Sequence, residues 1–254
     1  MSRDYQYSYS KLRPSVFDSD KRRRKAITIV KVCQDFLQTD DLAQLSLLDV
    51  GSSSGIIDNY LADFFGQVDG IDIDEPAMLF AQEQFKKPNL NFAQGDAMAL
   101  TQAENSVDVI VCSHVYEHVP DANQMFAEIY RVLKPGGFCY FSGNNRFMIM
   151  EPHYRLPFLS LLPRPLAHLY MRATGKGRYY HEKHVSFGAL KRLCSDFKLV
   201  DYSPVVIAKP DQYGTDYMLK PGSAKWRLAS FIARHMKWAT PHIWVLQKPA
   251  VIVE

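Results

Sequence analysis

The segment LLDVGSSSG, residues 47–55, carries the strongest structural signal in this chain of 254 residues. An apolar run ends at Val50 and is followed by Gly51, three serines and Gly55. Small residues before a helix let its free N–H groups approach a ligand. The spacing departs from the dinucleotide fingerprint G-x-G-x-x-G, because Ile56 stands where that pattern has its last glycine. The segment therefore predicts a strand, a ligand-binding turn and a helix.

Strands and helices alternate on both sides of this segment. Apolar, largely β-branched runs are separated by stretches in which apolar residues recur at helical spacing. Continuous apolar strands between helices are typical of a parallel sheet that helices cover on both faces. The sequence predicts an α/β, doubly wound fold whose ligand lies at the carboxyl ends of the strands. Its strands are expected at residues 45–50, 68–73, 90–92, 107–112 and 138–141.

Two carboxylates follow the next strands at informative places. Asp72 lies 21 residues beyond Gly51, where an acidic side chain can reach the hydroxyls of a ribose. Asp96 follows the third strand and can accept a hydrogen bond from an adenine amino group. Three successive strand ends along one edge of the sheet thus offer one site each for the tail, the ribose and the base of a nucleoside-containing ligand.

Five segments in this order resemble the class I S-adenosylmethionine-dependent methyltransferases, in particular the group called methyltransferase type 11. The resemblance covers about residues 45–145 and implies a Rossmann-like, mostly parallel seven-stranded sheet that ends in a reversed strand, here residues 243–247. It also implies S-adenosylmethionine as the cofactor. The five segments are LLDVGSSSG, VDGIDIDEPAM, QGDAMAL, SVDVIVCSHVYEHVPD and EIYRVLKPGGFCYFSGNN.

The resemblance assigns roles to individual residues. Asp72 is expected to bind the ribose of the cofactor, and Asp96 with Ala97 the adenine. The family usually has glycine where Ser53 stands, and serine tolerates a positive φ less well. The methionine part of the cofactor is expected beside Asp49, Gly51 and Gly55, and the site is completed by Ser52, Ser53, Ile73 and Ser113.

Histidines are the candidates for acid–base chemistry. A hydroxyl acceptor benefits from a base with a pKa near neutrality, which favours imidazole. His114 and His118 follow the fourth strand and are our catalytic candidates, although His118 equally suits packing or capping the next helix. His153, His181 and His184 lie in a later insert that is expected to cover the site. The sequence lacks an Asn/Asp-Pro-Pro-Tyr tetrad here, which argues against methylation of a nucleic-acid base nitrogen.

We divide the chain into an N-terminal arm and helix, residues 1–40, and a methyltransferase domain, residues 41–254. A helix is expected from Asp18 or Ser19 to about Leu37, and its KRRRK run, residues 21–25, is a solvated face or a phosphate contact. Two inserts interrupt the domain, a lid at about 145–185 and a helical segment at 208–241. A strand region at 199–207 and a helix at 225–238 are also predicted.

Charge is distributed unevenly along the chain. Residues 32–144 hold 4 Lys and Arg against 17 Asp and Glu, whereas residues 145–254 hold 17 against 7. A basic half that also contains leucine- and tryptophan-rich segments favours a small-molecule, glycan or lipid-linked acceptor and peripheral contact with an anionic membrane. The same segments also suit a lid that packs on its own domain, or a dimer contact, and the oligomeric state stays open.

The amino-acid composition excludes several classes of protein. Hydrophobic residues make up 47% and charged residues 22%, which excludes a largely disordered, collagen-like or coiled-coil chain. The four cysteines form no CxxC pair, so neither a disulfide framework nor a metal site is expected. The N-terminus lacks the apolar core of a signal peptide and no apolar run spans a membrane, which indicates a cytoplasmic protein, in one interpretation attached to the membrane surface.

The leading hypothesis is an S-adenosylmethionine-dependent methyltransferase that acts on oxygen of a small or lipid-linked acceptor. The alternatives are a soluble methyltransferase of small metabolites and a non-catalytic protein that binds S-adenosylmethionine and works through its basic surfaces.

Overall fold

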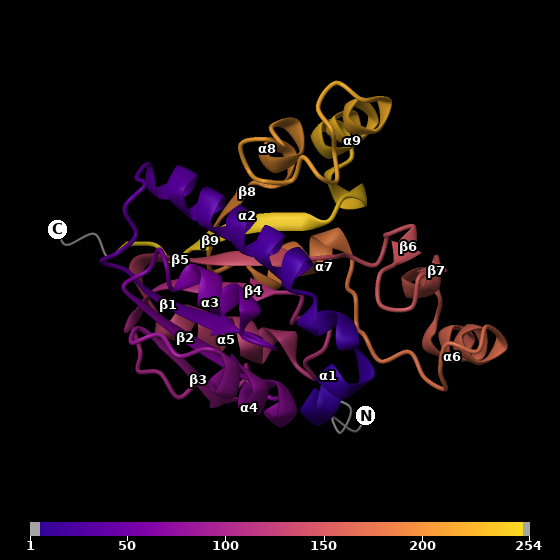
Figure 1. The fold of residues 1–254 in the computed structure, drawn as a ribbon. Coiled ribbons are helices and arrows are strands. Elements are labelled where there is room, and N and C mark those ends of the chain that lie inside the picture. The colour runs from indigo at the N-terminus through magenta and orange to yellow at the C-terminus, as the bar shows by residue number, and fades with distance from the viewer. Residues whose placement is uncertain (1–5, 251–254) are drawn as a thin grey trace.

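Seven strands form one sheet in the order β3-β2-β1-β4-β5-β9-β8 in the computed structural model, which describes residues 6–250 (Figure 1). The pairs β1–β2, β1–β4, β2–β3 and β4–β5 are parallel, whereas β9 runs antiparallel to both β5 and β8. The predicted doubly wound, mostly parallel sheet with a reversed last strand is confirmed. The strands are β1 Ser46–Val50, β2 Gln67–Asp72, β3 Leu90–Gln94, β4 Val107–Ser113, β5 Leu133–Gly143, β8 Lys198–Asp201 and β9 His242–Gln247.

Helices cover both faces of this sheet because the central strands are apolar on both sides. The helices α2 (Ser19–Leu37) and α3 (Ile56–Leu61) pack on one face, and α5 (Ala122–Val132) and α7 (Phe187–Leu193) pack on the other. The helix α4 (Glu75–Gln84) lies beside β2 and β3. The ligand-binding loops therefore meet at the carboxyl ends of the strands.

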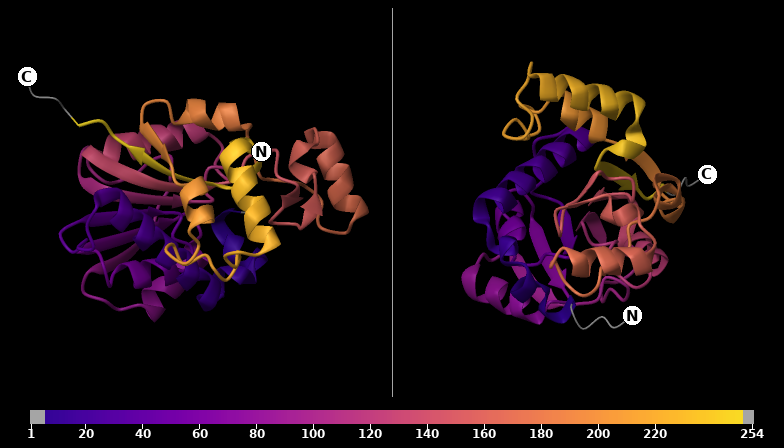
Figure 2. Two further views of the ribbon diagram at one scale, coloured as in Figure 1. Left: turned by 90° about the horizontal axis from the view of Figure 1, so that it is seen from above. Right: turned by 90° about the vertical axis from the view of Figure 1, so that its right-hand side faces the viewer.

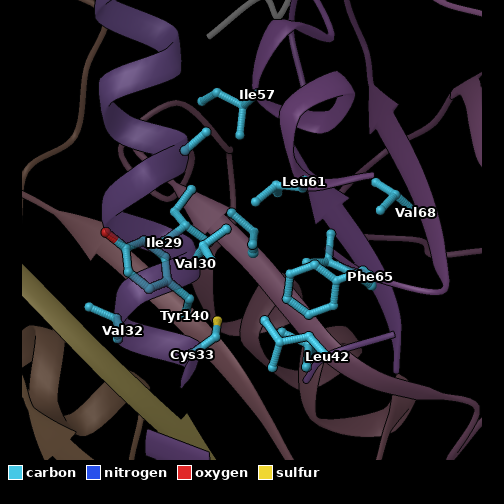
Figure 3. Close-up of a cluster of buried hydrophobic side chains, with 14 of the residues drawn as sticks. Ile29, Val30, Val32, Cys33, Leu42, Ile57, Leu61, Phe65, Val68 and Tyr140 are labelled. Atoms are coloured by element: carbon cyan, nitrogen blue, oxygen red, sulfur yellow. The ribbon is translucent and has the colours of Figure 1, made fainter. Parts of the chain in front are cut away.

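The helix α2 is part of the main core. Asp18 begins it by accepting a hydrogen bond from the Lys21 N–H at 3.1 Å, and the helix ends at Leu37, both as the sequence predicts. Gln38 follows in the left-handed conformation. Figure 3 shows Ile29, Val30 and Cys33 on the face of α2 that points toward Leu61 of α3. This packing fixes α2 relative to the sheet.

Three element predictions are wrong. The stretch expected as strand at 199–207 leaves the sheet at Asp201 and continues as α8 (Ser203–Ala208). The Asp201 carboxylate accepts from the Ser203 N–H at 3.0 Å and Pro204 occupies the first turn, so these start signals outweigh the β-branched run that follows. The helical spacing of apolar residues after Gly55 predicts a helix that reaches Phe65, but α3 ends at Leu61. The sequence Pro135-Gly136-Gly137 is expected to end the helix that begins at Asp121, but these residues lie inside β5.

Two further segments lie outside the sheet. The insert holds the short hairpin β6 (Met150–Glu151) and β7 (Leu156–Pro157) and the helix α6 (Arg164–Ala173), and Figure 2 shows it projecting from one end of the molecule. The second segment ends in the helix α9 (Ala224–His235). None of the helices within residues 6–250 is both long and apolar enough to cross a membrane. The remaining short helices are η1 Gln6–Ser8, α1 Tyr9–Leu12, η2 Pro14–Phe17, η3 Leu159–Leu161 and η4 Lys237–Ala239.

Candidate active site

A cavity of about 340 Å³ lies at the carboxyl ends of β1, β2, β3 and β4. The loops after these four strands form its floor, and the segment before α2 forms part of its opposite wall. The predicted residues that line it are Gly51, Ser53, Asp72, Ile73, Asp96, Ala97, Ser113, His114 and His118. The structure thus brings together side chains from all four strand ends that the sequence singled out.

The loop after β1 has a backbone conformation that allows a ligand to approach closely. Gly51, Ser53 and Gly55 have φ values of +91°, +54° and +70°. A Cβ atom on Gly51 would lie 2.4 Å from Cγ2 of Val115, so only glycine fits there. Ser53 adopts the positive φ that glycine normally provides, and its N–H donates to Asp72 Oδ2 at 2.9 Å. The departure from the family pattern at Ser53 therefore leaves the loop conformation intact.

Asp72 stands at the centre of the cavity floor. Its Oδ1 accepts from the Asp74 N–H and its Oδ2 from the Ser53 N–H, both at 2.9 Å. Burial raises the pKa of Asp72 to about 6, although these two N–H donors act in the opposite direction. The carboxylate is therefore fixed in position and still carries lone pairs for a diol. This is the chemistry that a ribose requires.

Three predicted cofactor residues lie behind the cavity wall. Asp49 and Ser52 are each 3% exposed, and Gly55 is buried where a Cβ would contact Phe92 and Ala81. Burial, together with the neighbouring Asp72, raises the pKa of Asp49 to about 7. A contact of Asp49, Ser52 or Gly55 with the cofactor stays a prediction, and their visible role is to support the loop.

The N-terminal segment and α2 contribute cavity residues that the sequence analysis missed. Tyr9 and Arg13 line the cavity from the arm, and Arg22 and Lys25 line it from the first turns of α2. Burial and the neighbouring Arg22 lower the pKa of Lys25 to about 8. Two members of the basic run thus line the cavity. Arg22 lies near Asp49 and Asp72, whereas Lys25 lines the cavity and is also exposed to solvent. The start of the helix at Asp18 was the available signal, because it fixes which side chains follow one turn later.

The arm is tied to the floor by hydrogen bonds. Both the backbone N–H and the hydroxyl of Ser10 bond to the Asp74 carboxylate, the hydroxyl at 3.1 Å. The Ser54 hydroxyl donates to the Val16 carbonyl oxygen at 2.6 Å. These contacts close the cavity on the side away from the sheet.

Histidines form the wall beside Ser113. His114 adopts a positive φ of +59°, and its Nδ1 lies 3.4 Å from Oε1 of the fully buried Glu117. Burial lowers the pKa of both His114 and His118, the latter to about 4, so both are neutral near pH 7. Neutral imidazoles offer a lone pair to a hydroxyl proton.

The insert adds a third imidazole to this wall. His153 lines the cavity, and its Nδ1 lies 2.6 Å from Oε1 of Glu151. Burial is the largest single influence and lowers the pKa of His153, but the bond to Glu151 and the charges of Glu151, Glu182 and Glu117 together outweigh it, so the net shift is upward. His184 is fully buried behind Glu151, whereas His181 lies outside the cavity, next to Tyr179. Of the three histidines predicted in the insert, the structure brings one to the cavity.

The fold and this cavity define a class I S-adenosylmethionine-dependent methyltransferase, with S-adenosylmethionine as its cofactor. Residues 48–141 match the family described as "Methyltransferase domain", and this match, together with the curated relatives, supports a class I methyltransferase of the type 11 group. A methyltransferase of Thermotoga maritima has the same fold, with a TM-score of 0.55 at 14% identity over 96% of this chain and 97% of that chain.

The curated relatives have similar names. A ubiquinone biosynthesis O-methyltransferase of Hydrogenovibrio crunogenus is 26% identical over 195 residues, which is 72% of this chain and 77% of the relative. One of the same name from Albidiferax ferrireducens is 35% identical over 133 residues, 48% of this chain and 52% of the relative. A demethylmenaquinone methyltransferase of Lactococcus lactis is 33% identical, over 48% of this chain and 52% of the relative. The chain thus spans about half the length of the last two.

Proposed function

We propose that this protein methylates a hydroxyl oxygen of a lipid-linked ring compound of the quinone-precursor type. The observation that carries the proposal is a second hollow of about 290 Å³ that shares Asn144 and Pro152 with the cofactor cavity. Its other lining residues are largely apolar, including Met148, Ile149 and Pro241. An acceptor with a polar ring and an apolar tail matches this pair of adjoining spaces. The names of the curated relatives support the same acceptor class.

The cofactor site has defined roles for this chain's residues. Asp72 binds the ribose hydroxyls, Asp96 and Ala97 bind the adenine, and the loop at Gly51 and Ser53 accommodates the methionine part. When bound, S-adenosylmethionine supplies a methyl group on a positively charged sulfur. The chain's contribution to the transfer is to align an oxygen with that methyl group and to exclude water.

The histidines that line the cavity, His114, His118 and His153, form a wall from which the hydroxyl proton of the methyl acceptor can be removed. His114 and His118 face the cavity next to Ser113, where the fourth strand ends. A neutral imidazole accepts the hydroxyl proton as the oxygen becomes nucleophilic. His114 is held at Glu117, so the charge that develops on its ring is compensated by a buried carboxylate. We therefore propose that His114 or His118 accepts the hydroxyl proton of the methyl acceptor.

The insert supports a membrane-facing entrance for the acceptor. Arg155 and Arg172 are exposed there, whereas Arg164 is bound to the carbonyl oxygens of Tyr180 and His181. We infer that this surface contacts an anionic membrane and receives the acceptor from it. Large apolar side chains are exposed on and beside the insert at Phe147, Ile149, Met150, Phe158, Leu166 and Leu169, with exposed fractions of 41–70%.

A soluble small-metabolite methyltransferase is the second candidate. The insert has a small core of its own in which Leu156, Leu159, Met171 and Tyr180 are buried, so it can act as a lid without a membrane. The second hollow favours the lipid-linked acceptor, because a small polar metabolite leaves it unfilled.

The decisive experiment is transfer of a labelled methyl group from S-adenosylmethionine into total cell extract. We expect the label in the organic phase, in a product whose new methyl group is an ether of a ring hydroxyl. Label confined to the aqueous phase would favour the soluble-metabolite function. Asp72→Ala protein serves as the control, because it is expected to lose cofactor binding and hence transfer.

A further inference from the structure

Three side chains on the histidine wall have the composition and spacing of a metal site. Ligand atoms of Glu117, His118 and His153 all lie within 4.8 Å of one another. Glu117 and His118 come from the loop after β4, and His153 comes from the turn of the β6–β7 hairpin, so the fold brings together residues distant in the sequence. His118 and His153 line the cofactor cavity, with ring centroids 5.0 Å apart.

The Glu117 carboxylate gives an independent indication of a bound cation. Its side chain is fully buried, and neither of its oxygens has a hydrogen-bond partner among residues 6–250. The closest cationic candidate is the Nδ1 of His114, at 3.4 Å from Oε1. Burying a carboxylate without hydrogen bonds is costly unless a positive charge compensates it. A divalent ion at this position would supply that charge.

His153 is oriented as metal-binding histidines usually are. Oε1 of Glu151 holds Nδ1 of His153 at 2.6 Å, and Oε2 of the same carboxylate accepts from the Tyr154 N–H at 2.8 Å. The ring therefore keeps Nε2 for a ligand. A carboxylate on the far nitrogen fixes the ring and raises its basicity in many metal sites. Glu151, His153 and His184 also cluster, but the bonds of Glu151 make it a supporting residue.

We propose that Glu117, His118 and His153 bind one divalent transition-metal ion, for which zinc is the best match. Two imidazoles and one carboxylate are a common ligand set for catalytic zinc and leave coordination positions open. Here the open positions face the cavity, because two of the three ligands line it. An ion there would coordinate a hydroxyl oxygen of the acceptor and lower the pKa of that hydroxyl. Because His118 would then be a ligand of the ion, His114 would accept the hydroxyl proton. This second part rests on the proposed methyl transfer, whereas metal binding does not.

Calorimetric titration of zinc into the chelator-treated full chain tests the site without methyl donor or acceptor. We expect one zinc ion per chain. His153→Ala and Glu117→Gln should each weaken binding at least about 100-fold, because loss of even a residue behind a ligand costs about 10- to 100-fold. His235→Ala is the matched control, since His235 is exposed on α9. It should bind zinc as the unchanged chain does.

Two additional measurements test whether misfolding causes the weaker zinc binding of His153→Ala and Glu117→Gln. Zinc should raise the melting temperature of the unchanged chain and of His235→Ala, but not of His153→Ala or Glu117→Gln. Cobalt in place of zinc should give the visible absorption of a low-coordinate site, and the two ligand variants should lack it.

The site is wrong if the unchanged chain binds no zinc, or if His153→Ala and Glu117→Gln bind zinc as well as His235→Ala does. Binding of S-adenosylmethionine to the zinc-free chain is measured in the same samples. Its retention alongside failed zinc binding would reject the metal site and leave the proposed methyl transfer standing.

Discussion

Asp72 joins the two loops of the cofactor floor through its two N–H bonds, to Ser53 and to Asp74. The same carboxylate is expected to accept the ribose hydroxyls of the cofactor. Asp72→Ala should weaken S-adenosylmethionine binding by about 1.5–3 kcal/mol, the range for hydrogen bonds to a charged group. Calorimetry measures the effect, with Asp69→Ala on the same strand as the control. Equal affinity of a folded Asp72→Ala variant would remove Asp72 from the site.

The raised pKa of Asp72 makes cofactor binding depend on pH. Burial raises this pKa to about 6, so the carboxylate is ionised above that pH and protonated below it. If the ionised form binds the ribose, affinity should fall about tenfold from pH 7 to pH 5. Asp72→Asn cannot titrate and should show a flatter profile over the same range. The same steep profile in Asp72→Asn would assign the pH dependence to another group.

At the scale of elements, the N-terminal arm is a wall of the cavity. The Ser10 hydroxyl of the arm bonds to the Asp74 carboxylate, and the Ser54 hydroxyl of the loop after β1 donates to the Val16 carbonyl oxygen of the arm. Ser10→Ala combined with Ser54→Ala should destabilise the docked arm by about 2 kcal/mol, at about 1 kcal/mol for each hydrogen bond. Hydrogen exchange of the amides of residues 9–17 should accelerate, while the exchange of the central strands should not change.

Ser106→Ala is the control for the arm, because the Ser106 hydroxyl bonds to the Ala103 carbonyl in an exposed turn. Its exchange at residues 9–17 should match that of the unchanged chain. Unaltered exchange in the double variant would show that contacts other than these hydroxyls hold the arm.

The elements that the sequence predicts well are those with a local cause. The helix start at Asp18, the turn at Gly51 and the carboxylate of Asp72 all follow from neighbouring residues. The approach of the arm to Asp74, and of the insert's His153 to His118, depends on packing between distant segments, which spacing does not reveal. The same reason explains why the sequence did not indicate the cluster of Glu117, His118 and His153. The strand expected at 199–207 ends at Asp201, because the Asp201 carboxylate on the Ser203 N–H and the proline at 204 outweigh the β-branched propensity of the residues that follow.

At the scale of the whole molecule, exposed apolar and basic side chains occur together on the insert, and α9 also exposes Leu228 and Phe231. If they contact a membrane, each basic residue near an anionic surface contributes about 1 kcal/mol. The chain should pellet with anionic liposomes at low salt and less so at 1 M salt, where the screening length falls to about 3 Å. Leu166→Ser combined with Leu169→Ser should reduce pelleting at both salt concentrations.

Leu79→Ser is the control for the liposome experiment. Leu79 is 53% exposed, as Leu166 and Leu169 are to 52% and 55%, but it lies on α4 beside the sheet. The variant should pellet as the unchanged chain does. Equal and negligible pelleting with anionic and neutral lipid would contradict the membrane contact and favour a lid.

The docked arm also bears on the release of the spent donor. Tyr9 and Arg13 line one side of the cavity in which the cofactor is expected, so we expect lifting of the arm to widen the path by which demethylated donor and fresh donor exchange. Opening of such a cover is slow enough in many enzymes to limit turnover. If each catalytic cycle includes one undocking of residues 6–17, the hydrogen bonds at Ser10 and Ser54 influence the rate of turnover as well as the stability of the docked arm.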